Sequence, residues 1–153
     1  MASMPAARQP GRRRTSASER PVVLVAASPV VQRLVQASLR DSGFRVDTVS
    51  RRELTPGLAV DLEPDVLVLD AASVADADRE LRGLADVPQV PVMVTCPASG
   101  AVPPAAILDA GAADVMSMPL DPAELAARVR SLVRRRGRAL GAGRLRVGGV
   151  IVD

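Results

Sequence analysis

The sequence contains no lysine and no histidine, so all 20 of its basic residues are arginine. Without these two residue types the chain has no Schiff-base lysine, no histidine general base and no histidine metal ligand. A Ser-His-Asp triad is therefore excluded, and so is a zinc site that contains histidine. We expect a protein without enzymatic activity of its own.

Cysteine and aromatic residues are almost absent as well. Cys96 is the single cysteine, which excludes an internal disulfide and a cysteine-based zinc site and fits a reducing cytoplasm. Phe44 is the single aromatic residue, so the chain lacks the stacking platforms of proteins that bind single-stranded nucleic acid. No apolar run is long enough to span a membrane, and none follows the N-terminal arginines as in a secretory signal. We expect a cytoplasmic protein with no membrane contact.

Charge is distributed unevenly along the 153 residues. Residues 1–20 carry a net charge of +4, residues 21–133 a net charge of −6, and residues 134–153 a net charge of +5. The first segment is rich in Arg, Ser, Pro and Ala without periodicity, which predicts a disordered basic tail. Basic segments at both ends allow contact with nucleic acid, and the alternative is that they are simply a solvated tail and a solvated linker.

The middle of the chain alternates strand patterns with helix patterns. Apolar, β-branched runs predict five strands, at 22–26, 44–49, 65–70, 90–95 and 113–118. Caps, prolines and apolar spacing predict helices after them, at 28–43, 51–60, 74–85, 104–110 and from 121 onward. This order predicts an α/β fold, with a five-stranded parallel sheet and helices on both faces, doubly wound.

In such a sheet the functional site lies at the carboxyl ends of the strands. The residues at these ends are Ala26 and Ala27, Asp70, Thr95 and Cys96, and Met118 followed by Pro119. Asp70 is the only ionisable side chain among them apart from the thiol. From the residues alone, Asp70 is either a site of chemistry or a carboxylate satisfied by nearby backbone N–H groups.

Three segments together resemble the receiver domain of bacterial response regulators. They are PDVLVLD (64–70), VPVMVT (90–95) and DAGAADVMSMPLDPAELAARV (109–129), and the last is most similar to the OmpR/PhoB subfamily. The resemblance covers about residues 21–136 and implies the CheY-like (flavodoxin-like) fold, with a βα unit repeated five times. In that family Asp70 would be the residue that accepts a phosphoryl group.

The resemblance also implies that the machinery around this aspartate is incomplete. The acidic pair that holds Mg²⁺ in the family is replaced by Ala26 and Ala27, and the family's lysine is replaced by Met118. We therefore expect no catalytic residue, no metal site and no bound Mg²⁺, since carboxylate oxygens are what that ion requires. The pocket is therefore predicted to be atypical and inactive, with Asp70 at the phosphoacceptor position but without a role in phosphoryl transfer.

Other positions of the family pattern change as well. The hydroxyl after the fourth strand falls at Thr95 or Cys96, and the spacing from Pro91 favours Cys96, which would weaken that role. The aromatic switch residue is Val115, and the Met118–Pro119 peptide is expected to be cis. Cys96 and Met118 are otherwise interpreted as packing residues.

Association surfaces are a separate expectation. In the OmpR/PhoB subfamily the segments equivalent to 104–110, 113–118 and the helix from 121 form a symmetric dimer face. Asp114, Glu124 and Arg128 match its charged positions, and Ile107 is predicted to supply an apolar centre. The alternative is an ordinary solvated helix face.

Residues 137–153 are predicted to be a linker and the start of a truncated winged-helix DNA-binding domain. The function predicted from the sequence is a phosphorylation-independent receiver domain that dimerises within a DNA-binding transcription regulator of the orphan type. The alternatives are a receiver phosphorylated on Asp70, or a stand-alone adaptor that binds a protein or a small molecule. A small-molecule effector above the vacated pocket is compatible with the first interpretation.

Overall fold

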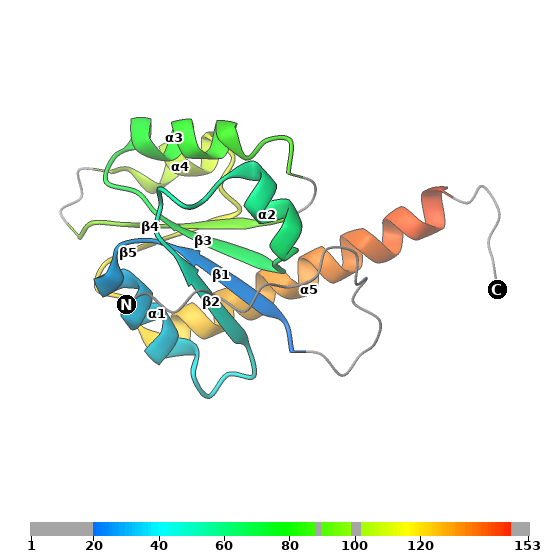
Figure 1. The fold of residues 1–153 in the computed structure, drawn as a ribbon, viewed down its shortest axis with the longest axis horizontal. Helices are drawn as coiled ribbons and strands as arrows, with labels where there is room; N and C mark the ends of the chain where they lie inside the picture. The colour runs from blue at the N-terminus through cyan, green and yellow to red at the C-terminus, as the bar shows by residue number, and fades with distance from the viewer. Residues whose placement is uncertain (1–19, 88–89, 99–101, 148–153) are drawn as a thin grey trace.

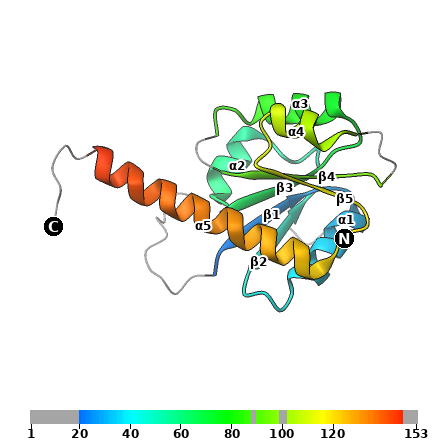
Figure 2. The same cartoon turned by 180° about the vertical axis from the view of Figure 1, so that it is seen from behind.

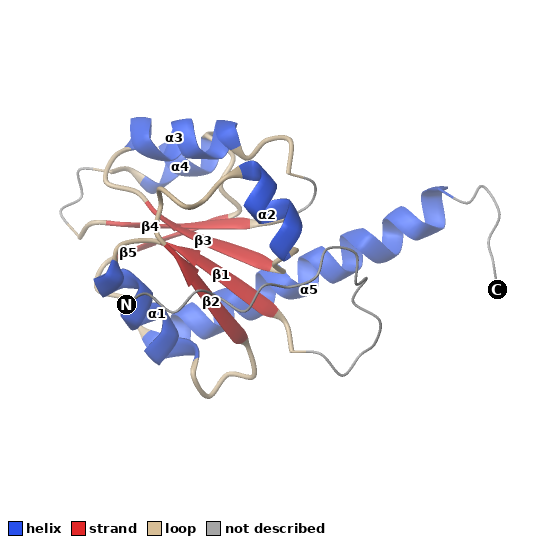
Figure 3. Cartoon of the chain, viewed as in Figure 1, coloured by secondary structure: helices blue, strands red, loops and turns tan. Residues whose placement is uncertain are grey.

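A computed structural model describes residues 20–87, 90–98 and 102–147 of the chain. Five strands alternate with five helices in this part: β1 (Val22–Ala26), α1 (Pro29–Leu39), β2 (Arg45–Val49), α2 (Pro56–Leu62), β3 (Val66–Asp70), α3 (Val74–Gly83), β4 (Val92–Cys96), α4 (Pro104–Asp109), β5 (Asp114–Ser117) and α5 (Pro122–Val147). All strand pairings are parallel, and the sheet order is β2-β1-β3-β4-β5. Helices α1 and α5 cover one face of the sheet, and α2, α3 and α4 cover the other (Figures 1 and 3). The predicted α/β doubly wound fold is confirmed.

The continuous apolar strands are explained by burial on both faces. In β3, Val66 and Val68 point into the core under α1 and α5, whereas Leu67 and Leu69 point into the core under α2–α4. Successive side chains of a strand alternate between faces, so a strand between two helical layers needs an apolar residue at every position. This alternation also decides which side chains meet at the strand ends.

Predicted helix caps are present where the sequence placed them. The Ser28 hydroxyl accepts a hydrogen bond from the backbone N–H of Val31 (3.5 Å), and the Asp121 carboxylate accepts one from Glu124 (2.8 Å). One helix differs: the segment expected to be helical from residue 51 is a turn, and α2 begins only at Pro56. The Thr55 hydroxyl caps α2 there, because proline fits the first turn of a helix but disrupts its interior.

The largest departure from expectation is the length of α5. Residues 137–147, predicted to belong to a linker, continue α5, which is one helix from Pro122 to Val147. Alanine, leucine and arginine favour helix and no proline interrupts them, which outweighs the glycines that suggested a linker. The C-terminal part of α5 extends beyond the sheet (Figures 1 and 2). The rest of the predicted winged-helix start and residues 1–19 of the basic tail lie outside the described residues.

Asp65 and Arg136 fasten this helix to the sheet. Asp65 lies just before β3 and accepts a hydrogen bond from the backbone N–H of Val22 at 2.7 Å, while its other oxygen receives Arg136 Nη1 at 2.8 Å. Both side chains of the ion pair are largely buried.

Within the described residues, no helix combines the length and the apolar character needed to cross a membrane.

Candidate functional site

Asp70 is the last residue of β3, and its neighbour across the sheet is Thr95 of β4. The Thr95 hydroxyl donates a hydrogen bond to Asp70 Oδ1 at 3.1 Å. Cys96 belongs to the core on the opposite face of the sheet, where its thiol contacts the backbone oxygen of Met116 at 3.6 Å. The preference for Cys96 as the hydroxyl position was therefore wrong, because strand alternation places Thr95, and not Cys96, on the face of Asp70.

Burial raises the pKa of the Asp70 carboxyl above its usual range. The hydrogen bond from Thr95 and the positive charge of Arg51 act in the opposite direction, and the charge of Asp76 adds to the effect of burial. Desolvation disfavours the ionised form, and one hydroxyl and one screened cation do not fully compensate for it. Asp70 is thus a partly buried carboxyl that has one side-chain hydrogen-bond partner within the described part of the chain, Thr95.

Ala26 and Ala27 end β1 beside Asp70, and both are fully buried. Their methyl groups belong to the two cores on opposite faces of the sheet. The backbone oxygens of Ala27 and Val49 are occupied by the side-chain amide of Gln32, at 2.8 and 2.9 Å. This end of the sheet is therefore closed by α1 through a neutral amide.

A divalent cation does not fit this set of residues. Magnesium needs several oxygen ligands, usually including carboxylates and waters. Ala26 and Ala27 offer no side-chain oxygen, so Asp70 stands without a second carboxylate from β1. Across the part of the chain that the structure describes, no three acidic, histidine or cysteine side chains gather as a metal site would require.

Met118 follows β5 and occupies the position from which the family's lysine would reach the phosphate. Its side chain is partly buried against the core under α1 and α5, and its backbone N–H donates to Cys96 O at 2.9 Å. The Met118–Pro119 peptide is cis, as predicted. Val115 is partly buried against the other core, so neither position carries a charge or an aromatic ring at the site.

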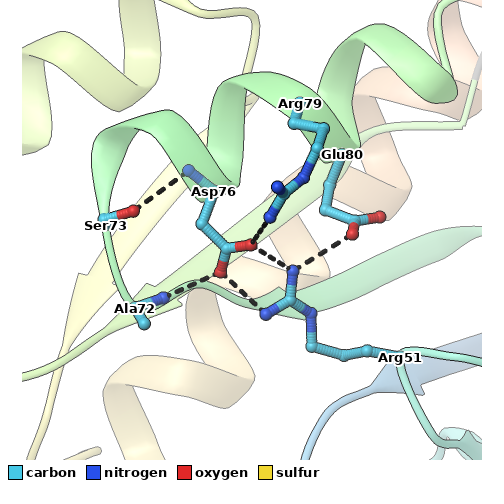
Figure 4. Close-up of polar contacts among 6 residues, drawn as sticks. All are labelled: Arg51, Ala72, Ser73, Asp76, Arg79 and Glu80. Atoms are coloured by element: carbon cyan, nitrogen blue, oxygen red, sulfur yellow. Dashed lines mark hydrogen bonds and ion pairs between the residues drawn. The ribbon is translucent and has the colours of Figure 1, made fainter.

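A charged cluster beside the site was not predicted from the sequence (Figure 4). Arg51, just after β2, donates two hydrogen bonds of 2.7 Å to the carboxylate of Asp76 on α3. It donates a third, of 3.1 Å, to the carboxylate of Glu80. Asp76 also accepts hydrogen bonds from the backbone N–H of Ala72 (3.1 Å) and from Arg79 (2.8 Å). The Arg51 clamp, defined as Arg51 with Asp76 and Glu80, ties the loop after β2 to α3.

Within the Arg51 clamp, Arg51 and Asp76 each shift the pKa of the other. The hydrogen bonds from Arg51 lower the pKa of Asp76 to about 2, and the carboxylate raises the pKa of Arg51 above its usual value. The charge of Arg51 also acts to lower the pKa of Asp70, although the larger effect of burial keeps that pKa raised. A cation therefore stands near the aspartate after all, but it approaches from β2 and is bound to carboxylates of α3.

The predicted association face contains an ion-pair network within one chain. Arg128 of α5 donates to Asp114 of β5 at 2.9 and 3.1 Å and to Glu124 at 2.8 and 3.0 Å. These bonds raise the pKa of Arg128. The structure thus brings the three predicted charged residues together.

Ile107 does not belong to that face. It is 0% exposed and lies in the core under α2–α4, whereas its neighbour Leu108 is 46% exposed. One residue along a helix turns the side chain by about 100°, so a one-residue error exchanges core for surface. The prediction of Ile107 as an apolar centre of an interface is wrong, and Leu108 is the exposed apolar residue of α4.

The sequence is similar to those of bacterial transcription regulators. The chain is 34% identical over 119 residues to the KDP operon transcriptional regulatory protein KdpE of Escherichia coli, covering 74% of this chain and 51% of that protein. It is 35% identical over 130 residues to the transcriptional regulatory protein PrrA of Mycobacterium leprae, covering 80% and 54%. The chain spans about half the length of these relatives. No protein-family model matches the sequence.

Solved structures support the fold. A response regulator receiver domain protein from Clostridium thermocellum superimposes with a TM-score of 0.62 at 15% identity, over 79% of this chain and 99% of that one. At this level of identity the likeness concerns the fold alone. It agrees with the strand order and the layers described above.

Proposed function

Because the chain is a response-regulator receiver domain with OmpR/PhoB-family relatives, we propose that it is a phosphorylation-independent receiver that regulates transcription by dimerising. The observation that carries this proposal is the pair of buried alanines at the end of β1, where a working site needs carboxylates. In this proposal the domain has no enzymatic activity and acts in the cytoplasm. It would place DNA-binding domains C-terminal to it on paired half-sites. The names of its relatives, both transcriptional regulatory proteins, support a role in transcription.

Phosphoryl transfer to Asp70 would need charge neutralisation that these residues do not supply. Transfer to a carboxylate is largely a matter of positioning and of stabilising negative charge, for which receivers and related enzymes use a metal ion and a cation. Here Ala26 and Ala27 cannot hold the metal, and Met118 carries no charge. Among the described residues, Thr95 is the one whose side chain forms a hydrogen bond with Asp70. Loss of one such preorganised group typically costs about 10²–10³ in rate, and several are missing.

Incubation of the folded protein with Mg²⁺ and acetyl phosphate is expected to leave its intact mass unchanged. A receiver domain with a complete acidic pair and lysine, treated in parallel, serves as the positive control and should gain one phosphoryl group. A gain of one phosphoryl group by this chain that disappears in Asp70→Asn would reject phosphorylation independence. The second candidate function, a receiver phosphorylated on Asp70, would then replace the first.

Dimerisation is proposed to use the face formed by α4, β5 and α5. These elements carry Leu108, an exposed large apolar residue of α4, and the network of Arg128, Asp114 and Glu124 on β5 and α5. Exposed ion pairs contribute only about 0–1 kcal/mol each, so they define the register of two copies better than they hold them together. In the monomer Arg128 pairs with Asp114 and Glu124 of its own chain. In the dimer it would pair with the same acids of the second copy, so the charges would be paired in both the monomer and the dimer.

Light scattering of the untreated protein is expected to give the mass of a dimer, and Arg128→Glu is expected to give a monomer. Charge reversal places a third negative charge beside Asp114 and Glu124, which repels the matching face of the partner. Arg45→Glu is the matched control, because Arg45 is also an exposed arginine paired with an acid but lies on β2, the opposite edge of the sheet. A wild-type monomer at high concentration would contradict the proposal, as would equal effects of the two reversals.

The stand-alone adaptor differs from this proposal in lacking a DNA-binding domain C-terminal to the receiver. Reading the coding frame past Asp153 separates the two, since a continuing winged-helix frame excludes the adaptor. A small-molecule effector above Ala26 and Ala27 remains a prediction. It fails if Ala26→Asp and Met118→Trp leave the affinity of every effector unchanged.

A further inference from the structure

The C-terminal part of α5 carries a row of exposed arginines. Arg130, Arg134 and Arg138 are each four residues apart, and all three are exposed. Residues four apart on a helix lie on the same side, about 6 Å apart along the axis. Arg135 is also exposed and lies next to the row. The row thus forms a positive ridge along one side of α5.

The ridge faces away from the body of the protein. Leu125, Val129 and Leu132 are buried on α5, and Arg136 reaches back to Asp65, so these four define the side that meets the sheet. At about 100° per residue, Arg134 and Arg138 lie roughly opposite them. Figures 1 and 2 show this part of the helix extending beyond the sheet, with none of the described helices and strands over it.

The positive charge of the ridge has no compensation on its own helix. No Asp or Glu occurs between Glu124 and Asp153, so no arginine from 130 onward has an acidic residue three or four positions away in α5. Among the described residues, none of the three row arginines is in an ion pair. A solvated helix usually mixes both signs of charge, and here arginines four apart repel each other. Such an array is stabilised by a partner that is itself a dense row of negative charges.

We propose that this ridge, Arg130, Arg134 and Arg138, binds the phosphate backbone of duplex DNA. A duplex carries one negative charge per ~1.7 Å of axis, and arginine is suited to phosphate contacts. In a second copy no two acidic residues are adjacent in the sequence, so its negative charges are more scattered than the phosphates of a duplex. A membrane surface is a poorer match, because helices that lie on lipid combine basic residues with large aromatic or apolar anchors, and Phe44 is the only aromatic residue of the chain.

This inference goes beyond the proposed function because it assigns DNA contact to the receiver's own last helix. The contact needs neither phosphorylation nor a winged-helix domain, and it carries no base readout. It would hold the receiver against DNA beside whatever site a DNA-binding domain selects. Arg136 is a positioning residue in this arrangement, since its pair with Asp65 sets the angle at which α5 leaves the sheet.

The test is fluorescence anisotropy of a labelled duplex of arbitrary sequence, titrated with the 153-residue protein between ~50 and ~200 mM salt. Replacement of Arg130, Arg134 and Arg138 by glutamine, a good helix former, is expected to weaken binding at least about tenfold at the lower salt. It should also reduce the slope of log K against log salt by about 2 to 3. Circular dichroism checks that the variant keeps its fold.

The matched control replaces Arg12, Arg13 and Arg14 by glutamine, which removes the same charge from the N-terminal segment. This control is expected to change affinity and salt slope much less than the helix variant does. Equal losses in the two variants, or a loss only in the control, would overturn the proposal. Failure of the wild-type protein to bind the duplex at ~50 mM salt would also overturn it, as would tighter binding to vesicles of anionic phospholipid than to the duplex.

Discussion

Ile107→Ala is expected to lower the free energy of unfolding by about 2–5 kcal/mol. Ile107 is 0% exposed and packs in the core between the sheet and the α2–α4 layer. Removal of its outer carbons loses the transfer free energy of the buried groups, and it leaves a cavity that the surrounding strands cannot fill. Urea denaturation, with the slope of free energy against urea compared between variants, measures the loss.

Leu108→Ala is the matched control on the same short helix. Leu108 is largely exposed, so this substitution should change the free energy of unfolding by less than about 0.5 kcal/mol. Its expected effect is on association instead, because Leu108 lies on the proposed dimer face. If Leu108→Ala destabilised the monomer as much as Ile107→Ala, the assignment of these two residues to surface and core would be rejected.

Arg51→Met is expected to destabilise the protein by about 2 kcal/mol at neutral pH, because the pKa of Asp76 is lowered to about 2 by Arg51. The side chains of Arg51 and Asp76 are 29% and 12% exposed, so solvent screens this pair less than an ordinary surface pair. Removing Arg51 leaves the Asp76 carboxylate partly desolvated, with Arg79 and the backbone N–H of Ala72 as its remaining partners.

The same shift predicts a dependence on pH. A carboxyl whose pKa is lowered by folding stabilises the protein above its unfolded pKa, near 3.8, and this contribution is lost as the pH falls through about 2. Wild-type protein should therefore lose roughly 2 kcal/mol from this group between about pH 5 and pH 2. Arg51→Met should lose much less over that interval. Thermal or urea unfolding at a series of pH values gives the comparison.

Arg82→Met provides the control for this prediction. Arg82 also pairs with an acid of α3, Asp78, but Arg82 is 79% exposed and the pair is four residues apart on one helix. Its loss should stay within about 0.5 kcal/mol and should not alter the acid dependence. Equal effects of Arg51→Met and Arg82→Met would show that the Arg51 clamp is no stronger than an ordinary surface pair.

The central strands β1, β3 and β4 were predictable because each is short, apolar at nearly every position and bounded by caps, prolines or glycines. Gly43 and Gly111 illustrate this, since both have positive φ, at 80° and 114°, where the sequence predicted the ends of helices. The length of α5 was not predictable from composition. Its glycines and arginines resemble a linker, and its continuation to Val147 follows from helix propensity and from the anchoring of Arg136 to Asp65.

The hydroxyl partner of Asp70 was misassigned for a geometric reason. Counting from Pro91 along β4 favoured Cys96, but the pairing of Asp70 with Thr95 across the sheet decides which side chain shares its face. The Arg51 clamp was missed because its members are far apart in the sequence. Asp76 and Glu80 are four residues apart on α3, so their carboxylates lie on the same side of the helix, where one arginine can bind both. This spacing was the local feature that favoured a cation at that position.

The sequence by itself determined the fold class, the position of Asp70 at a strand end, and the presence of Ala26, Ala27 and Met118, which carry no charge, at the neighbouring strand ends. These properties depend on residue type and on periodicity, which are local. Tertiary structure alone decided that Thr95 meets Asp70 and that Arg51 binds Asp76. It also decided that Ile107 is core, and that Arg130, Arg134 and Arg138 lie on the side of α5 away from the sheet. Each of these depends on strand register or helix rotation, where a shift of one residue turns a side chain to a different face.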